Sequence, residues 1–436
     1  MISSQEFIAR QERLLAQCLP DSVCLIPAAS LVTRSRDTEY LFRQNSDFWY
    51  LTGFEEPDAW LLLSNHSRHG GSYRAMVCLP KDPQAEVWHG RRLGAEQALV
   101  RFSVDEAYEL DELEDILPEW LEGHQQLYFA LGDNDAADNL VQEALALLRQ
   151  APKENRAPGG IMDIRPMLHE MRLFKSACEV AAMKAAAQIT AAAHCRAMKF
   201  SAPGRFEYQL EAEIHHEFAM AGARSPAYGT IVGSGENACI LHYTENASQL
   251  QAGDLVLIDA GAEYQGYAAD ITRTFPVSGT FSEAQKAIYN LVLDAQEGVL
   301  AMLKPGVTLP EASAVAVRIL TEGLVKLNIL KGTVDENIAS KAWQQYFLHG
   351  LGHYLGLDVH DVGDYKLNGE DRPLQPGMVI TVEPGLYFPN QPQVPEAYRG
   401  IGVRIEDNVA ITATGVEILT ADVPKTVAGI EVLMKG

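Results

Sequence analysis

The sequence predicts an α/β domain followed by an α+β domain, and three observations support this fold class. Helical and strand-like segments alternate up to about residue 170. After that point, two helices followed by a set of strands occur twice in succession. The chain has 436 residues, enough for two or three domains with a sizeable core. We therefore expect an N-terminal α/β domain over residues 1–172 and a C-terminal domain over residues 173–436.

The N-terminal half reads as alternating elements of the two kinds. Apolar, β-branched runs bounded by turn residues predict strands, and amphipathic stretches predict helices. The expected strands are Ser22–Pro27, Trp60–Ser64, 72–79 and 126–131, and the expected helices are 7–18, 94–101 and 136–149. The polar segment APKENRAPGG (151–160), rich in proline and glycine, is predicted to be a linker.

The C-terminal half contains an approximate repeat in the order of its elements. A capping box begins the first helix of each copy, formed by Ser176 with Glu179 and by Ser282 with Gln285. The expected elements are helices over 176–202 and 205–221, strands within 229–277, helices over 282–304 and 309–327, and strands within 346–416. The repeat lies in the pattern and not in sequence identity, and it suggests a site at the seam of two related halves.

Composition excludes several classes of function. There are 35 basic and 58 acidic residues, a formal net charge of −23, which argues against nucleic-acid binding. The N-terminal sequence MISSQEFIARQERLLAQ lacks the apolar core of a signal peptide, and no apolar run is long enough to predict a membrane span. The six cysteines are scattered without CxxC pairs, as expected for free thiols in a reducing compartment, so we expect a cytoplasmic protein.

Five residues in the C-terminal half carry most of the chemical information: Asp259, Asp270, His353, Glu383 and Glu406. They offer four carboxylates and one imidazole, all near strand-like segments. This oxygen-rich set is typical of sites for Mn²⁺, Mg²⁺ or Co²⁺, and it differs from the thiolate ligands of a structural zinc site. Two adjacent ions balance four carboxylates better than one ion does, and two ions sharing a hydroxide are a known device for hydrolysis.

Asp259 ends an apolar strand, and Gln265-Gly266 can turn the chain into a returning strand over 267–277. A two-residue turn places Asp259 opposite Thr272, so that Asp270 is its diagonal neighbour on the same face. Diagonal neighbours lie roughly 7–8 Å apart, close enough to share a metal pair. A β-bulge would reverse the parity, and both residues would then be turn or surface aspartates.

Three histidines fall within a short stretch, at positions 349, 353 and 360. His349 and His353 have the spacing of a helical zinc site, but position 350 is glycine, so the HExxH motif is absent. The two intervening glycines argue against a helix and favour a loop whose backbone approaches a ligand closely. Since a single histidine is often an ordinary core residue, the concentration of three is what points to function.

Glu383 ends a second apolar strand, and Glu406 follows Arg404 by two positions, so the latter two share a strand face. Arg404 can orient a metal-bound glutamate, or form an ordinary cross-strand ion pair. His242 lies among apolar neighbours that also fit a buried histidine. No GxGxxG, GxxxxGK or GxSxG motif supports a nucleotide site or a serine hydrolase.

Together, these segments resemble the pita-bread metallopeptidase family, M24, and within it the bacterial aminopeptidase P type. The resemblance covers most of the chain and is carried by HEMRLFKS (169–176), TIVGSGENACILHYTEN (230–246), DLVLIDAGAEYQGYAADITRTFPV (254–277), HGLGHYLGLDVHDVG (349–363), PGMVITVEPGLY (376–387) and YRGIGVRIED (398–407). The block TRSRDTEYLFRQNSDFWYLTGF (33–54) is also similar to this subgroup, which argues against the shorter methionine aminopeptidases. Creatinase-like members lack the metal ligands, whereas all five ligand positions are filled here.

The resemblance implies a pita-bread catalytic domain with an internal pseudo-twofold repeat. It also implies an N-terminal domain that builds the oligomer, a tetramer or a dimer, and narrows the substrate cleft. The expected reaction releases the N-terminal residue from peptides with proline in second position, with a metal-bridging hydroxide as nucleophile. The expected cofactors are two divalent ions per subunit, Mn²⁺ being usual for this group.

The resemblance further assigns roles to individual residues. Asp259 and Asp270 would bind one ion; Asp270, His353, Glu383 and Glu406 would hold the other, with Glu406 also bridging. Glu383 would be the general base, and His360 and His242 would position and polarise the scissile carbonyl. His349, Arg404 and Tyr387 would flank the proline pocket. Trp88 would reach a neighbouring subunit's site, although its sequence context fits a core tryptophan equally well.

Two alternatives remain open from the sequence. A prolidase, which cleaves only Xaa-Pro dipeptides, shares the five ligands. A non-catalytic binding module on the same fold could keep the ligands by descent, although the four histidines at positions 242, 349, 353 and 360 argue against it.

Overall fold

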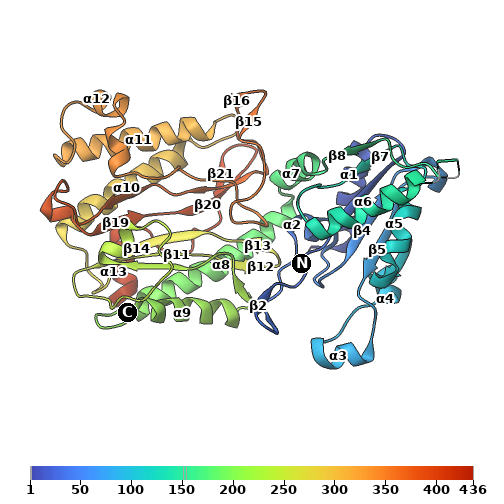
Figure 1. The fold of residues 1–436 in the computed structure, drawn as a ribbon. Coiled ribbons are helices and arrows are strands. Elements are labelled where there is room, and N and C mark those ends of the chain that lie inside the picture. Colours follow the sequence, from blue (N-terminus) through green and yellow to red (C-terminus); the bar gives the residue numbers. More distant parts are fainter. Residues whose placement is uncertain (1, 151, 154, 436) are drawn as a thin grey trace. The chain divides into compact units, whose positions relative to one another are not determined.

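The structure of the protein, a computed structural model, describes residues 2–150, 152–153 and 155–435. These residues form two compact units, Ile2–Met171 and the chain from Arg172 onward, and the boundary falls within helix α7 (Arg165–Leu173). Each unit has its own hydrophobic core (Figure 1). The predicted fold class, α/β followed by α+β, is confirmed.

A six-stranded sheet in the order β6-β5-β4-β1-β7-β8 organises the first unit. Strand β1 pairs antiparallel with β4 and parallel with β7, so it lies at the centre. The strands are β1 (Ser22–Pro27), β4 (Trp60–Ser64), β5 (Tyr73–Cys78), β6 (Glu106–Glu109), β7 (Gln126–Tyr128) and β8 (Gly160–Met162), with a separate hairpin of β2 (Thr33–Ser35) and β3 (Thr38–Glu39). The helices are α1 (Ser4–Gln17), α2 (Ser46–Thr52), α3 (Pro83–His89), α4 (Ala95–Arg101), α5 (Leu113–Leu121) and α6 (Asp135–Gln150).

Apolar side chains on one face of this sheet pack against two helices. Val23, Leu25 and Leu62 belong to one buried cluster with residues of α5 and α6. All five residues of β4 are buried, which explains its continuous apolar sequence, since a strand covered on both faces does not alternate.

The sequence predicted a linker over residues 151–160, but this segment does not connect the two units. Residues 160–162 form β8, which pairs in parallel with β7, so the described part of the segment is a loop inside the first unit. Residues 151 and 154 lie outside the described residues. The composition identified a loop correctly, but a short edge strand with few apolar residues carries no periodic signal.

The second unit contains the predicted repeat of element order (Figure 1). The first copy has α8 (Ala177–Phe200), α9 (Glu207–Met220) and a sheet of β10 (Ile231–Ser234), β11 (Leu255–Ala260) and β14 (Ile271–Pro276). The second copy has α10 (Glu283–Met302), α11 (Leu309–Lys326) and a sheet of β17 (Val379–Val382), β20 (Asp407–Ile411) and β21 (Val416–Ile418). Helix α8 packs against the strands of the first copy, and α10 packs against β17 and its neighbours.

Shorter elements complete the second unit. They are β9 (Ser225–Pro226), β12 (Ala262–Tyr264), β13 (Tyr267–Ala268), α12 (Val334–Ala339), β15 (Lys366–Leu367), β16 (Glu370–Asp371), β18 (Gly385–Phe388), β19 (Ile401–Arg404) and α13 (Val427–Lys435). In the described residues no helix is long and apolar enough to cross a membrane.

The predicted register of the hairpin between β11 and β14 is confirmed. Asp259 lies opposite Thr272, with no shift along the ladder, so Asp259 and Asp270 keep the same-face relation. The turn at Gln265 and Gly266 has positive φ at both residues, 52° and 78°, as a two-residue hairpin turn requires.

The returning strand is interrupted, which the sequence did not predict. Residues 267–277 divide into β13 and β14, with Ala269 and Asp270 between them. Gly261 lies opposite this break, where a Cβ atom would approach the carbonyl oxygen of Ala269 to 1.7 Å. The close approach requires glycine, and it accompanies the turn of the chain that directs Asp270 into the site.

Candidate functional site

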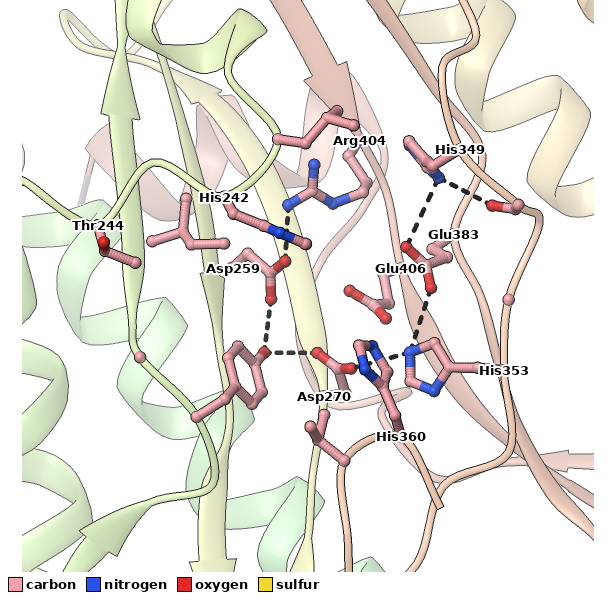
Figure 2. A pocket seen from close by; sticks show the side chains of 17 residues that line it. His242, Thr244, Asp259, Asp270, His349, His353, His360, Glu383, Arg404 and Glu406 are labelled. Carbon is pink, nitrogen blue, oxygen red and sulfur yellow. Dashed lines mark hydrogen bonds and ion pairs between the residues drawn. The ribbon is translucent and has the colours of Figure 1, made fainter. Parts of the chain in front are cut away.

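A cavity of ≈ 480 Å³ in the second unit brings together nine of the residues singled out from the sequence. They are His242, Asp259, Asp270, His349, His353, His360, Glu383, Arg404 and Glu406 (Figure 2). The volume lies within the usual range for a small-molecule or peptide-end pocket.

The side chains come from the ends of strands and from the loops next to them. Asp259 is on β11 and Asp270 immediately precedes β14, in the first copy of the repeat. Glu383 immediately follows β17, and Glu406 lies between β19 and β20, in the second copy. The cavity is therefore built from both copies, at the seam that the repeat predicted.

Three potential ligand atoms, from Asp270, His353 and Glu406, lie within 4.8 Å of one another. His353 Nε2 lies 3.5 Å from Asp270 Oδ2 and 3.4 Å from Glu383 Oε1. The carboxylates of Asp270 and Glu406 are almost completely buried. Such a cluster is costly unless a cation balances its charge.

Hydrogen bonds orient His353 for coordination. Its Nδ1 lies 2.9 Å from the backbone carbonyl oxygen of Tyr354, so Nδ1 donates a proton there and Nε2 keeps its lone pair toward the carboxylates. Thr381 accepts from the backbone N–H of His353 and donates to Glu383 Oε1, at 3.0 Å each. Ligand-orienting contacts of this kind typically accompany metal sites in proteins.

The protonation of the carboxylates reflects a shortage of positive charge. Burial, followed by repulsion from Asp259, raises the pKa of Asp270 well above its usual value. Burial and the neighbouring Glu406 raise the pKa of Glu383 to about 8. The pKa of Glu406 is likewise raised, first by burial and then by Asp270. Divalent cations bound here would oppose these shifts and favour the ionised carboxylates.

Asp259 is the exception, because Arg404 lies beside it. Burial alone would raise the pKa of Asp259, but the guanidinium outweighs it and holds the pKa below its usual range. Arg404 Nη2 donates to Asp259 Oδ2 over 2.6 Å. The same arginine donates through Nε to Thr272 Oγ1, which in turn donates to Glu406 Oε2 over 2.6 Å. Arg404 therefore contacts the ligand set on both sides.

The donor set fits divalent cations with oxygen ligands. It combines several buried carboxylate groups with one imidazole whose free nitrogen faces them, and among the described residues that line the cavity only Arg404 brings an opposing charge. Hard or borderline ions such as Mn²⁺ prefer this chemistry.

Tyr228 is a site residue that the sequence analysis missed. Its Oη lies 2.5 Å from Asp259 Oδ1 and 2.5 Å from Asp270 Oδ1, so it donates to one carboxylate and approaches the other. It follows the two-residue strand β9 in a loop without periodicity, so one tyrosine there gives no signal in the sequence. Asn408, on β20, was also missed, although its side chain accepts from the backbone N–H of Asp270 and donates to the backbone carbonyl oxygen of Asp270.

A chain of hydrogen bonds runs from Arg404 to His349. Arg404 Nη1 donates to Tyr387 Oη over 2.8 Å, and Tyr387 Oη lies 2.7 Å from His349 Nε2. Tyr387 does not line the cavity itself but supports two residues that do. Burial, followed by the charge of Arg404, lowers the pKa of His349 to about 4, so its ring is neutral near pH 7.

His360 and His242 lie on the solvent side of the site, and both are exposed. The rings of His360 and His353 meet edge to face with centroids 4.4 Å apart. Partial burial, followed by the neighbouring His353 and His242, lowers the pKa of His360. The alternative of a buried core residue is wrong for His242.

Trp88 is not among the residues that line this cavity. It is in α3 of the first unit and is 83% exposed, so the alternative of a core tryptophan is wrong. Its neighbour Val87 is 78% exposed. Two adjacent exposed apolar side chains on a short helix are typical of a contact surface.

Comparisons with known proteins give similar families, sequences and structures for most of the chain. The family described as metallopeptidase family M24 matches residues 181–413, and the aminopeptidase P N-terminal domain matches residues 7–128. The chain is 54% identical to Xaa-Pro aminopeptidase of Escherichia coli, over 99% of this chain and 98% of that protein. It is 34% identical to human Xaa-Pro aminopeptidase 3, over 99% of this chain and 86% of that protein.

Solved structures of Escherichia coli aminopeptidase P are similar throughout. A substituted form in complex with substrate has a TM-score of 0.97 and 53% identity, and covers 100% of this chain and 98% of that one. A zinc-substituted form in complex with product gives the same four values.

Proposed function

The chain belongs to metallopeptidase family M24, and we propose that it removes the N-terminal residue from peptides whose second residue is proline. The observation that carries this proposal is the buried cluster of Asp270, His353 and Glu406, next to Asp259 and Glu383 in one cavity. Relatives at 54% and 49% identity, matched over almost their whole length, are Xaa-Pro aminopeptidases. Prolidase activity is not favoured.

The proposed cofactors are two Mn²⁺ ions. Asp259 and Asp270 would hold one ion, and Asp270, His353, Glu383 and Glu406 the other, with Glu406 contacting both. When bound, such ions would supply an activated water or hydroxide as nucleophile near neutral pH. The raised pKa values of Asp270 and Glu406 support a site that is completed by cations.

The protein's own groups would handle the proton and the substrate. Glu383 would take the proton from the attacking water and pass it to the leaving proline nitrogen. His360 and His242 would donate hydrogen bonds to the carbonyl oxygen as it gains negative charge. Their exposure on the open side of the cavity supports a role toward substrate.

We assign the proline pocket to the hydrogen-bonded chain of His349, Tyr387 and Arg404. Neutral His349 offers an apolar ring face without a free charge, because its two nitrogens are engaged by Gly350 and Tyr387. A prolyl amide nitrogen carries no hydrogen, so a pocket that demands no N–H donor from the substrate tolerates it.

The proposed setting is a cytoplasmic homo-oligomer, a tetramer or a dimer. The scattered free cysteines support a reducing compartment. Exposed Val87 and Trp88 support an interface between copies of the chain, through which Trp88 would reach a neighbouring active site. The N-terminal unit would then form the interface and narrow the cleft.

The deciding experiment compares an Xaa-Pro-Yaa tripeptide with an Xaa-Pro dipeptide, using metal-free and Mn²⁺-loaded protein. We expect release of the first residue from the tripeptide, only with metal. Cleavage of the dipeptide alone would indicate prolidase, and binding without cleavage of either would indicate a non-catalytic module.

Sedimentation of the Trp88→Ala variant beside wild type tests the proposed interface. An unchanged oligomeric state would mean that Trp88 does not contribute to the interface.

A further inference from the structure

A buried glutamine on α10 touches the chain directly before two of the metal-site glutamates. Gln296 is 0% exposed. Its Nε2 donates to the backbone carbonyl oxygen of Val382 over 3.2 Å and to that of Ile405 over 3.1 Å. Val382 precedes Glu383, and Ile405 precedes Glu406. One amide group therefore bridges the two segments that present these glutamates.

The bridge lies where the strand pairing is interrupted. The ladder of β17 and β20 ends at Val382 opposite Asp407, and the ladder of β18 and β19 begins at Gly385 opposite Arg404. The residues between these ladders, including Glu383 and Glu406, have no regular partner strand in either ladder. Their spacing must come from other contacts, and Gln296 joins the two edges of the gap.

Every polar atom of the Gln296 side chain is engaged. Lys425 Nζ donates to its Oε1 over 2.9 Å, and this fixes which side of the amide faces the two carbonyls. Lys425 also donates to Asp407 Oδ2 over 2.8 Å, next to Glu406. A side-chain amide is costly to bury unless its polar atoms form hydrogen bonds. The hydrogen bonds to Val382, Ile405 and Lys425 therefore explain why α10 tolerates a buried glutamine at this position.

We propose that Gln296 is a positioning residue that sets the separation of Glu383 and Glu406 and so determines divalent metal affinity. The inference rests on the proposed function, in which both glutamates hold metal. Gln296 is not among the residues that line the cavity, and its hydrogen bonds go to Val382, Ile405 and Lys425. It acts through the two peptide carbonyls, in the way that groups around a metal site orient its ligands.

The test is the affinity of full-length protein for Mn²⁺, measured after chelator dialysis by titration with the electron paramagnetic resonance signal of free Mn²⁺. Gln296→Met keeps the side-chain length and removes both donated bonds. We expect its Mn²⁺ affinity to fall about 10-fold, within the range for lost ligand-orienting contacts. The fall should appear without substrate, which separates it from any effect on turnover.

Gln285→Met is the matched control. Gln285 is on the same helix, is also buried, and also donates one hydrogen bond to a backbone carbonyl, that of Gly253 over 2.7 Å. It does not adjoin any metal-site residue in the strands. Its variant should lose thermal stability but keep wild-type Mn²⁺ affinity. Equal losses of affinity in both variants would overturn the proposal, since general destabilisation would then explain them.

Two further outcomes separate this proposal from the proposed function. Wild-type protein that binds no divalent ion would overturn both. Wild-type binding with unchanged affinity in Gln296→Met would overturn only the role of Gln296. If Gln296→Met does not fold, Lys425→Met removes the ammonium that orients the amide. Reduced Mn²⁺ affinity in that variant supports the proposal, and unchanged affinity overturns it.

Discussion

Hydrogen bonds determine which ring nitrogen of His349 carries the proton. Arg404 can only donate, so Tyr387 accepts from it and gives its own proton to His349 Nε2. His349 Nδ1 must then carry hydrogen, which it donates to the carbonyl oxygen of Gly350 over 2.8 Å. A single arginine thus fixes the tautomer of a histidine two contacts away.

At the residue scale, the first prediction concerns His360. His360→Ala should reduce kcat about 10²–10³-fold, because one donor to a developing oxyanion is worth about 3–4 kcal/mol. KM for an Xaa-Pro-Yaa tripeptide should change little, since the bond strengthens mainly in the transition state. Steady-state kinetics with Mn²⁺-loaded protein measure both constants.

His216→Ala provides the control for that measurement, because His216 is exposed on α9 and does not line the cavity. Its kcat should equal that of wild type. A His360→Ala enzyme that lost activity only through KM would contradict the assignment to the oxyanion.

Sequence reasoning found the residues that end apolar strands, because a carboxylate there stands out against its neighbours. Asp259 and Glu383 are of this kind. Sequence reasoning did not identify Tyr228 or Gln296, for two different reasons. Tyr228 lies in a loop, where residues follow no periodic pattern of apolar and polar side chains. Gln296 is on a helix, where a polar residue is ordinary, and its role becomes visible only when its partner carbonyl groups are known.

At the element scale, the loop that carries His360 is fastened by a buried ionic cluster. Lys175 Nζ lies 2.8 Å from Asp361 Oδ2, and Arg172 Nη2 lies 2.6 Å from Asp361 Oδ1. Burial would raise the pKa of Asp361, but Lys175 and Arg172 keep it below its usual value. Asp361 follows His360 directly, so the cluster holds the loop in place.

Lys175→Met should therefore affect both stability and catalysis. Removing one partner of a buried pair costs about 3–5 kcal/mol, and we expect the lower end because Arg172 still pairs with Asp361. Urea unfolding measures the loss. Under conditions in which the variant is still folded, its kcat should also fall, because His360 loses its fixed position.

Lys184→Met makes the same chemical change on the surface. Lys184 pairs with Glu417 over 2.6 Å, but both side chains are nearly half exposed. Its removal should cost less than about 1 kcal/mol. Similar losses in the two variants would mean that burial of the Lys175 cluster has no special effect.

Helix α8 supplies a prediction about pH. Its His194 is fully buried and donates to the carbonyl oxygen of Ala260 over 3.2 Å; burial lowers its pKa from 6.5 to about 4. The unfolded chain therefore binds a proton first as the pH falls. Stability is complete above pH 6.5 and decreases toward pH 4, by about 2 kcal/mol at pH 5.

His194→Gln keeps an amide donor for Ala260 without a titrating ring. Urea unfolding at pH 7.5 and pH 5 should give a smaller pH difference for this variant than for wild type. Parallel losses in the two proteins would assign the pH dependence to other groups.

The order of elements was predictable because two capping boxes and two helix pairs recur in the same sequence. The interruption at Ala269 was not, because it depends on an approach between Gly261 and Ala269 that only the folded hairpin reveals. Apolar runs determine that a strand exists, whereas contacts with other segments determine where it breaks.

At the scale of the whole molecule, two units with separate cores should respond differently to metal. The ligand residues all lie in the second unit. A ligand present at 100 times its Kd stabilises the state that binds it by about 2.7 kcal/mol. Calorimetry with and without Mn²⁺ should shift the transition of the second unit and leave that of the first unchanged.

A chelator titration provides the reverse measurement. Removal of metal should return the transition of the second unit to its lower temperature and leave the transition temperature of the first unit unchanged. If both transitions moved together, the units would unfold as one cooperative system, and the prediction would be wrong.

The division of the ligands between the two copies of the repeat also has a consequence for biosynthesis. Glu406 is the last of the five to leave the ribosome, after the helices of both copies. A product of interrupted translation that stops before it lacks the residue proposed to contact both ions. We expect such fragments to lack peptidase activity, because the proposed ligand set is complete only once synthesis has passed Glu406.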